Sequence, residues 1–336
     1  MKNDRLISSG MIRDLRFMCP DTKKDVLLSG YSRWRIGGVA DCVVSPATVE
    51  ELVDVISYVR NRTIPYVIIG ETSNLLFPTE GIRALVIHFG KNFSKLSIAG
   101  SRVFAQSGAW VPRFSLSVAK MGLGGTEHMI GIPGTLGGLI YMNGGSSRKG
   151  VGDHVVKVNT LSPEGDLAVF NREECGFQYR SSVFQSNGHI IISAEFDYPL
   201  SGDAVAVRRD MLRILRERRR KFPRKTPNCG SVFVSDPKMY KEYGSPGEII
   251  ERCGLKGLEK GNAKISELHA NFILNKGAAT AEDVLFLINL VQKTAEKETG
   301  YSMRSEVRYV TPFGMTVPAH ERAAELYPNN FIEKVK

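Results

Sequence analysis

A glycine-rich segment near the middle of the chain, MIGIPGTLGGLIYMNGG at residues 129–145, limits the folds that this sequence can adopt. Glycine has no Cβ, so backbone N–H groups can converge there on an oxygen-rich anion, and Pro133 keeps the chain extended beside them. The segment lacks both the G-x-G-x-x-G spacing and the Lys-Ser/Thr pair of a P-loop, which disfavours a doubly wound dinucleotide-binding sheet and a nucleoside triphosphatase. Alone, it predicts either a pyrophosphate-holding loop or a set of tight turns between buried elements.

Segments typical of β-strands surround the glycines. Strands are predicted at residues 41–45, 65–69 and 83–89, in a hairpin over 94–108, in a hairpin over 154–170 that turns at 163–166, and at 189–200. Leu52, Val55, Ile56 and Val59 have helical spacing and predict a helix between the first two strands. Residues 1–200 therefore predict an α+β fold with mixed or antiparallel strand pairing.

The pattern changes after Asp203, where a long helix is followed by short strands and further helices. The clearest of these helices covers residues 280–298: Thr280 is its predicted N-cap, Asp283 follows three residues on, and Gly300 ends it. A strand is predicted at 305–310, and no strong signal follows residue 315. A domain boundary is therefore expected near residue 200.

The basic run at residues 208–225 contains ten Lys and Arg against two acidic residues, so it accounts for most of the net charge of +10. Met211, Leu212, Leu215 and Phe222 give it a narrow apolar stripe. The favoured interpretation is a solvated helix that leads into the second domain, and attraction of an anionic substrate or nucleotide cofactor is the alternative. RNA binding is disfavoured because no aromatic residues interleave the charges.

Composition narrows the class of protein further. With 336 residues, of which 42% are hydrophobic, the chain can bury a large core in about two domains. Its five cysteines form no C-x-x-C pair and no long apolar run occurs, so we expect a cytoplasmic protein without a signal peptide or membrane span. His128 and His269 have no partner at ligand spacing, which predicts no metal site, and Glu127 and His128 are expected to be structural.

Three segments together resemble one known family: WRIGGVAD at 34–41, IGETSNLLF at 69–77 and GIPGTLGGLIYMNGG at 131–145. They are similar to the FAD-binding domain of the UDP-N-acetylenolpyruvoylglucosamine reductases, also called UDP-N-acetylmuramate dehydrogenases. Further matches follow in order: YRSSVFQ at 179–185, CGSVF at 229–233, CGLKG at 253–257, HANFILN at 269–275, ATAEDV at 279–284 and SEVRYV at 305–310. The resemblance extends over residues 30–312, and its collinearity makes it specific.

The resemblance implies an α+β architecture with a vanillyl-alcohol-oxidase-like, PCMH-type FAD-binding domain in two lobes and a C-terminal α+β substrate-binding domain. The expected boundaries are an N-terminal extension at 1–26, the FAD-binding domain at 27–201, the substrate-binding domain at 202–314 and a tail at 315–336. The chain lacks a long tyrosine-bearing insertion, which makes it similar to the shorter type of the family.

The family's reaction would use NADPH to reduce FAD, whose N5 would pass hydride to the methylene carbon of UDP-N-acetylglucosamine enolpyruvate. The product, UDP-N-acetylmuramate, is a peptidoglycan precursor. Hydride addition leaves negative charge beside a carboxylate, and the resemblance assigns three residues to it. Arg180 would hold the substrate carboxylate, Glu306 would share a hydrogen bond there with a pKa raised by burial, and Ser231 would donate the proton.

Other residues are implied as binding residues. Tyr179, Arg180 and Ser231 would contact the nucleotide-sugar substrate, although Tyr179 could instead only pack. The FAD residues carried over are Gly70, Ser73, Asn74, Leu75, Gly131, Ile132, Pro133, Gly134, Thr135, Gly138, Asn143 and Gly144. Without the resemblance, Arg180 would be interpreted as a surface ion pair, Ser231 as a turn residue and Glu306 as an exposed strand residue. Nucleic-acid and membrane partners are not expected, and the oligomeric state is not predicted.

Two departures from the family pattern keep alternatives open. Glu71 and Thr72 stand where the family often has glycines, and Val234, Ser235 and Asp236 replace a common Lys-Asn-Pro. Loss of the cation and gain of the Asp236 carboxylate are expected to weaken phosphate binding there. One alternative is therefore a paralogous flavoenzyme that reduces another unsaturated carboxylate, and the other is a non-catalytic flavin-binding or nucleic-acid-binding protein.

Overall fold

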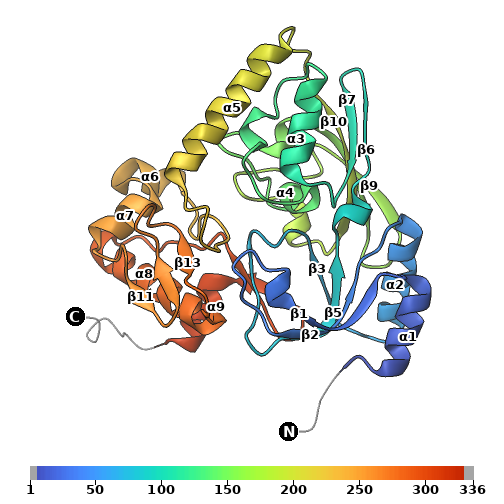
Figure 1. Cartoon of the computed structure of the whole chain (residues 1–336), viewed down its shortest axis with the longest axis horizontal. Coiled ribbons are helices and arrows are strands. Elements are labelled where there is room, and N and C mark those ends of the chain that lie inside the picture. The colour runs from blue at the N-terminus through green and yellow to red at the C-terminus, as the bar shows by residue number, and fades with distance from the viewer. Residues whose placement is uncertain (1–5, 329–336) are drawn as a thin grey trace. The chain divides into compact units, whose positions relative to one another are not determined.

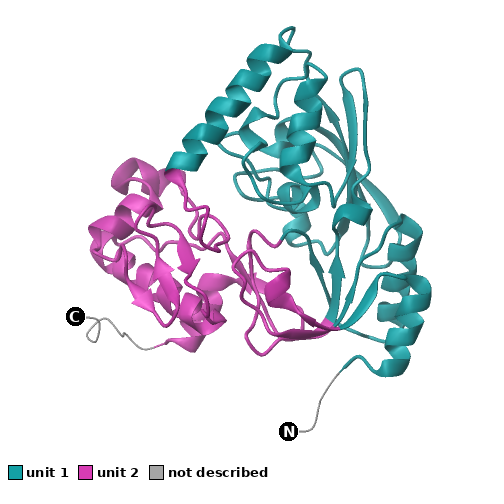
Figure 2. Cartoon of the chain, viewed as in Figure 1, with its two compact units in different colours: residues 1–24, 42–71, 85–220 teal, residues 25–41, 72–84, 221–336 magenta. Residues whose placement is uncertain are grey.

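A computed structural model describes residues 6–328 of the chain. The chain divides into two compact units, each made of separate stretches of sequence (Figure 2). Unit 1 comprises residues 1–24, 42–71 and 85–220, and unit 2 comprises residues 25–41, 72–84 and 221–336. The units divide the chain differently from the predicted domains, whose boundaries stay predictions.

The helices and strands follow the expected α+β pattern (Figure 1). The helices are α1 (Ser9–Met18), α2 (Val49–Asn61), α3 (Val111–Lys120), α4 (Leu136–Tyr141), α5 (Ala204–Lys221), α6 (Pro237–Tyr243), α7 (Pro246–Arg252), α8 (Ala281–Thr299) and α9 (Ala319–Leu326). The strands are β1 (Thr22–Leu27), β2 (Val39–Val44), β3 (Tyr66–Ile69), β4 (Leu75–Leu76), β5 (Ile82–His88), β6 (Leu96–Ala99), β7 (Arg102–Gln106), β8 (Val155–Leu161), β9 (Leu167–Asn171), β10 (Ile190–Asp197), β11 (Glu259–Lys260), β12 (Ala263–Ile265), β13 (Ile273–Asn275), β14 (Arg308–Val310) and β15 (Thr316–Pro318).

Unit 1 contains an antiparallel sheet of order β6-β7-β10-β8-β9. Both predicted hairpins are confirmed, and their turns use Gly100 and Gly165 at positive φ. Phe114 of α3 packs against Phe196 of β10 and against Tyr198, which directly follows this strand, and the three rings make an aromatic core beside the sheet. A second sheet has the order β1-β2-β5-β3, and its β3–β5 pair is parallel, so the expected mixture of pairings is confirmed.

Unit 2 contains two small sheets, β11-β12-β13 and β15-β14-β4, together with α8. The predicted α8 is confirmed: its stripe of Val284, Leu287, Ile288, Val291 and Ala295 is buried, and Gly300 ends it in the left-handed conformation. The strand predicted at 305–310 is shorter and begins at 308. Residues 316–326, where no element was predicted, form β15 and α9, whereas residues 329–336 of the predicted tail lie outside the described part.

The start of α8 gives a first prediction. Thr280 accepts a hydrogen bond from the Asp283 N–H at 3.1 Å, and the Asp283 carboxylate accepts the Thr280 N–H at 3.1 Å. Because this capping box satisfies backbone groups that the helix cannot, Thr280→Ala should lower the free energy of unfolding by about 1 kcal/mol. Urea denaturation followed by circular dichroism measures this loss. Glu298→Ala, at an exposed position near the other end of α8, is the comparison variant, and an equal loss from both substitutions would contradict a specific effect of the cap.

The helices and the cysteines of residues 6–328 bear on two expectations from composition. None of the helices there combines the length and apolarity that a membrane span requires. All five cysteines are free thiols.

Candidate active site

The glycine-rich segment of unit 1 is not a single loop. Its first part is held by pairing between backbone groups: the Val111 N–H donates to the Gly134 carbonyl at 2.9 Å, and the Leu136 N–H donates to the Ala109 carbonyl at 2.8 Å. Helix α4 then begins at Leu136 and includes two of the glycines. The interpretation of the whole segment as loop and turns is therefore wrong from Leu136 to Tyr141.

Close approaches explain several of these glycines. A Cβ on Gly137 would lie 2.8 Å from the Ser107 Cβ, and one on Gly145 would lie 1.9 Å from the Lys149 carbonyl oxygen. A Cβ on Gly70, which comes from a different predicted FAD-binding segment, would lie 2.2 Å from Thr135 Oγ1. The fold thus brings Gly70 and Thr135 together in unit 1 and leaves no room there for a side chain.

Arg180 and Tyr179 occupy the tip of a tight turn. Gln178 and Ser181 exchange both backbone hydrogen bonds, at 3.0 and 3.1 Å, so the two residues between them project from the chain. Arg180 adopts φ 57°, its guanidinium donates to the Gly145 carbonyl at 3.0 Å, and it lies 5.1 Å from the centre of the Tyr179 ring. This contact places the predicted carboxylate-binding arginine at the end of the glycine-rich segment.

A second arginine contacts this segment, and the sequence interpretation missed it. A Cβ on Gly131 would lie 2.5 Å from Arg218 Nε and 2.6 Å from its Cδ, so the Arg218 side chain fills the space that glycine leaves. Burial lowers the pKa of Arg218, and the charge of Arg180 lowers it further. Unit 1 therefore holds two cations beside the glycines, and nearby positive charges favour an anion between them.

A signal for Arg218 was present in the helical spacing. Val207 and Met211 of α5 are buried against Ala119 and Ile130, and Arg218 follows Met211 by two turns on the same face. The predicted stripe was partly wrong, because Leu212 is 46% exposed. The basic run is thus a packed helix with one arginine turned inward, in addition to its solvated face.

Asn143 and Gly144, predicted to bind FAD, have structural contacts. The Asn143 carbonyl oxygen Oδ1 accepts the Gly152 N–H at 3.0 Å, and its amide donates to the Gln178 carbonyl at 2.8 Å. A Cβ on Gly144 would lie 2.5 Å from Leu139 Cδ1. These contacts tie the end of the glycine-rich segment to the turn that carries Arg180.

Ser231 lies in unit 2, directly after a glycine that bends the chain. Gly230 has φ 88°, a conformation that favours glycine, and its N–H donates to Asn228 Oδ1 at 3.0 Å. Cys229, before it, is buried, and burial together with the negative charge of Glu306 raises the pKa of its thiol. The predicted proton donor therefore follows, two residues on, a buried cysteine whose thiol has a raised pKa.

Ser231 and Glu306 lie on neighbouring chain segments. The Glu306 N–H donates to the Val232 carbonyl at 2.7 Å, and Phe233 pairs with Ser305 as an antiparallel bridge. On the other side, Asn271 binds both backbone groups of Phe233 with its side-chain amide, at 2.8 and 2.9 Å. Asn271 is a supporting residue that the sequence interpretation did not single out, although it lies in the matched segment HANFILN.

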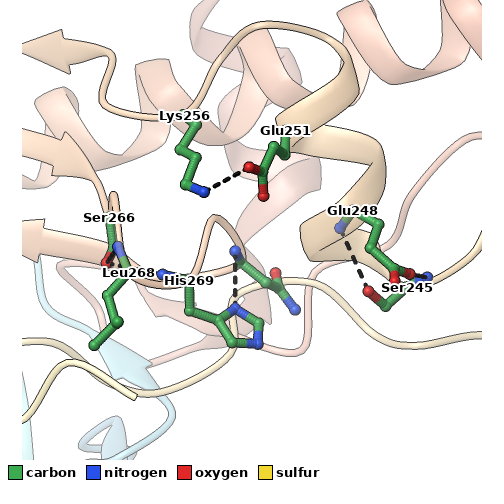
Figure 3. Close-up of polar contacts among 8 residues, drawn as sticks. Ser245, Glu248, Glu251, Lys256, Ser266, Leu268 and His269 are labelled. Carbon is green, nitrogen blue, oxygen red and sulfur yellow. Dashed lines mark hydrogen bonds and ion pairs between the residues drawn. The ribbon is translucent and has the colours of Figure 1, made fainter. Parts of the chain in front are cut away.

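The loop before Asn271 is itself fixed by side chains (Figure 3). Ser266 Oγ accepts the N–H groups of Leu268 and His269, at 3.2 and 3.3 Å, and His269 Nδ1 accepts the Asn271 N–H at 3.3 Å. His269 also contacts Phe222 and Phe272. Burial lowers the pKa of His269, and Lys221 lowers it further. His269 is therefore a neutral structural residue.

The segment Ser73-Asn74-Leu75 also lies in unit 2, next to Glu306. The Asn74 amide donates to the Glu306 carbonyl at 2.9 Å, and Leu75 of β4 pairs with Arg308 of β14. Thr72 adopts φ 51°, which is unusual for a β-branched residue. Its hydroxyl accepts the Arg33 N–H at 3.1 Å and donates to the Tyr31 carbonyl at 2.8 Å, and these bonds hold the position where the family often has glycine.

Asp236, a departure from the family pattern, has a structural role. Its carboxylate caps α6 by accepting the Lys238 N–H at 2.9 Å, and it lies 3.7 Å from the Arg304 guanidinium. Burial acts to raise the pKa of Asp236, but the hydrogen bonds to the helix start and to Tyr301, together with the charge of Arg304, outweigh it and lower this pKa. Its negative charge is thus compensated within unit 2, so the expected repulsion of a phosphate is reduced.

The remaining histidine prediction concerns His128, which is buried. Its Nδ1 accepts the Ser146 N–H at 3.4 Å, and burial lowers its pKa to about 4, so it is neutral and structural at pH 7. Across residues 6–328, no cluster of three or more His, Cys, Asp or Glu has the arrangement of a metal site.

The structure therefore collects the predicted site residues into two groups. Unit 1 brings together Gly70, the glycine-rich segment, Thr135 and Arg180, and it adds Arg218. Unit 2 brings together Ser231, Glu306 and Asn74. The first group contains two cations beside a glycine-rich backbone, and the second contains a hydroxyl and a carboxyl group.

Comparisons with known proteins match the chain in two parts. A family model described as an FAD binding domain matches residues 40–171, and the model of the C-terminal domain of UDP-N-acetylenolpyruvoylglucosamine reductase matches residues 222–310. The expected order of an FAD-binding domain followed by a C-terminal reductase domain is confirmed.

Individual relatives cover nearly the whole chain. The UDP-N-acetylenolpyruvoylglucosamine reductase 1 of Corynebacterium glutamicum is 45% identical over 91% of this chain and 91% of its own length, and the reductase of Carboxydothermus hydrogenoformans is 38% identical over 83% and 91%. The crystal structure of the Thermus caldophilus UDP-N-acetylenolpyruvylglucosamine reductase superposes with a TM-score of 0.72 at 30% identity, over 85% of this chain and 98% of that one. The chain belongs to the UDP-N-acetylenolpyruvoylglucosamine reductase family.

Proposed function

We propose that this protein is an FAD-dependent reductase that converts UDP-N-acetylglucosamine enolpyruvate to UDP-N-acetylmuramate for peptidoglycan precursor synthesis. The observation that carries this proposal is the hydrogen bond of 2.7 Å from the Glu306 N–H to the Val232 carbonyl. It joins the segment that carries the Glu306 carboxyl group to the segment that carries the Ser231 hydroxyl, and the proposed reaction uses both groups. NADPH as the hydride donor and a cytoplasmic location are parts of the same proposal.

The residues of unit 1 fit FAD on physical grounds. The glycine-rich segment can offer backbone N–H groups to an anion, and Arg180 and Arg218 beside it supply positive charge for an anionic cofactor. Gly131 and Thr135 would lie along the cofactor in this arrangement, and Asn143 and Gly144 would support the loop behind it. Bound FAD supplies the hydride for the reaction.

The protein's own residues would manage the charge and the proton. Arg180 would bind the substrate carboxylate with its planar fork of donors, whose charge matches the negative charge that develops on reduction. The Ser231 hydroxyl would donate a proton to the carbon next to that carboxylate, and Glu306 would hydrogen-bond there. Each role matches a group that can carry it out: a guanidinium at a turn tip, a hydroxyl after a glycine bend and a carboxylate on the adjoining segment.

The direct test is steady-state kinetics on purified protein that contains FAD. We expect NADPH oxidation that depends on UDP-N-acetylglucosamine enolpyruvate, with formation of the lactyl ether measured by mass spectrometry. Flavin-containing protein that consumes no NADPH with this substrate, but does so with another unsaturated carboxylate, would support the paralogue instead. Colourless protein that binds no added FAD would exclude both enzymes.

Arg218 gives a further prediction for this site. Because its charge lies against the glycine-rich segment, Arg218→Met should make the flavin harder to reduce. The midpoint potential of the bound flavin should fall by about 30 mV for each factor of ten by which the substitution weakens binding of the reduced, negatively charged flavin relative to the oxidised flavin. Arg219→Met, on the exposed face of α5, is the matched control. Equal potentials in the two variants, measured by dye-coupled titration, would exclude a role for Arg218 at the cofactor.

A further inference from the structure

Helix α9 lies beyond residues 222–310, which the C-terminal family model covers, yet its first turn contacts both neighbours of Glu306. The Ala319 N–H donates to the Val307 carbonyl at 2.9 Å, and the His320 N–H donates to Ser305 Oγ at 3.1 Å. No side chain of the preceding segment caps α9. The helix start is therefore satisfied by the segment that carries Glu306.

The contact between His320 and Ser305 is reciprocal. The Ser305 N–H donates to His320 Nδ1 at 3.2 Å, while the Ser305 hydroxyl lies 3.0 Å from the same nitrogen and 2.9 Å from the Val307 carbonyl. We call this pair, Ser305 and His320, the α9 clamp. Ser305 is buried and His320 is half-buried, so water does not readily replace these bonds.

The clamp completes a set of bonds around Glu306. Its own N–H donates to the Val232 carbonyl at 2.7 Å, and its own carbonyl accepts the Asn74 amide at 2.9 Å. With Ser305 and Val307 bound to α9, the backbone on both sides of Glu306 is fixed as well. The Arg322 guanidinium, one turn further along α9, lies 5.7 Å from the centre of the Tyr309 ring and adds a second attachment of the helix to β14.

We propose that His320 is a positioning residue of the enzyme: through the α9 clamp it fixes the segment 305–307 and so holds Glu306 in the place where it acts on the substrate. This inference rests on the proposed role of Glu306. A displacement of a catalytic group by about 1 Å can cost a factor of about 100 in rate, so a clamp next to Glu306 has a functional effect beyond stability.

The clamp requires neutral His320, because Nδ1 must accept the Ser305 N–H. Burial lowers the pKa of His320 from its ordinary value of 6.5, Glu321 on the same helix acts in the opposite direction, and Arg304 on the preceding segment lowers it. Protonated Nδ1 carries an N–H that would face the Ser305 N–H, and two donors cannot form a hydrogen bond with each other. The clamp is therefore intact above this pKa and is lost as the pH falls through it.

The test compares two substitutions in the FAD-loaded enzyme. His320→Ala removes the acceptor, whereas His320→Asn keeps an oxygen that can accept the Ser305 N–H and that does not titrate. We expect His320→Ala to lower kcat about 10- to 100-fold with a smaller change in KM, and His320→Asn to restore most of this loss. In the wild-type enzyme, protonation of His320 should lower kcat at acid pH. His320→Asn should lack this decrease.

Ala324→Gly is the control for stability, because it weakens α9 at an exposed position without touching the clamp. Its melting temperature should fall while its kcat stays near wild type. Either of two results would overturn the proposal. The first is an equal kcat for His320→Ala and His320→Asn. The second is a loss of kcat in Ala324→Gly as large as that in His320→Ala when the two variants have the same melting temperature.

Glu306→Gln, measured in parallel, separates this proposal from the one on which it rests. If Glu306→Gln keeps full activity, the proposed role of Glu306 fails. If Glu306→Gln loses activity while His320→Ala keeps it, the clamp alone fails.

Discussion

Ser231→Ala is expected to slow reduction of the enolpyruvyl substrate by a factor of about 10² to 10⁴, the usual contribution of a general acid. The methyl group of alanine fits where serine stood, but no proton donor remains after the bend at Gly230. Bleaching of the flavin by NADPH should be unchanged, because that step needs no proton from Ser231. Stopped-flow absorbance measures the two half-reactions separately.

Ser235→Ala is the matched control for this prediction, since it removes a hydroxyl four residues further along. Both half-reactions of that variant should match the wild type. A Ser231→Ala enzyme that reduces the substrate at the wild-type rate would show that another group donates the proton.

Arg180→Lys is expected to lower kcat/KM for the enolpyruvyl substrate by a factor of about 10² to 10³, although the positive charge is kept. Lysine lacks the planar fork that can bind a carboxylate through two parallel hydrogen bonds, and its charge is a single point. The lysine amine can still reach toward the Gly145 carbonyl, which Arg180 binds at 3.0 Å, so FAD content should be unchanged. Steady-state kinetics together with the ratio of flavin to protein absorbance tests both parts.

Arg113→Lys, on the exposed side of α3, controls for a general effect of replacing an arginine in unit 1. It should have wild-type kinetics. If Arg180→Lys lowers kcat/KM no more than Arg113→Lys does, Arg180 does not bind the carboxylate as a fork.

The elements that the sequence predicted are those whose signals are local. Helix α8 has a capping box at Thr280, a stripe of buried residues and a glycine that ends it, so each part of the pattern lies within the helix itself. The hairpins were predicted for the same reason, because a turn glycine separates two alternating strands.

Two of the helices that were missed, α4 and α9, depend on distant contacts. Helix α4 contains Gly137 and Gly138, which disfavour a helix, but Leu136, Leu139 and Ile140 are buried in the core of unit 1. Helix α9 is short and buries only Ala319 and Ala323, so it has little hydrophobic periodicity. Tertiary packing, rather than a local signal, therefore determines that these two segments are helical.

The candidate site likewise contains residues that the sequence indicates and residues that depend on distant contacts. The resemblance named Ser231 and Glu306, but the bond between Glu306 and Val232 joins segments that are far apart in sequence, and pairing of this kind is not encoded locally. Arg218, Asn271 and His320 were not singled out because each acts through a contact with a distant backbone segment. Only the folded chain reveals these supporting residues.

The most direct test of the account is a single-turnover experiment on the FAD-loaded protein. The protein is bleached with NADPH without oxygen and is then mixed with one equivalent of UDP-N-acetylglucosamine enolpyruvate. We expect the yellow flavin absorbance to return and one equivalent of UDP-N-acetylmuramate to form. Bleached protein that stays bleached, with the enolpyruvyl substrate recovered intact, would contradict it.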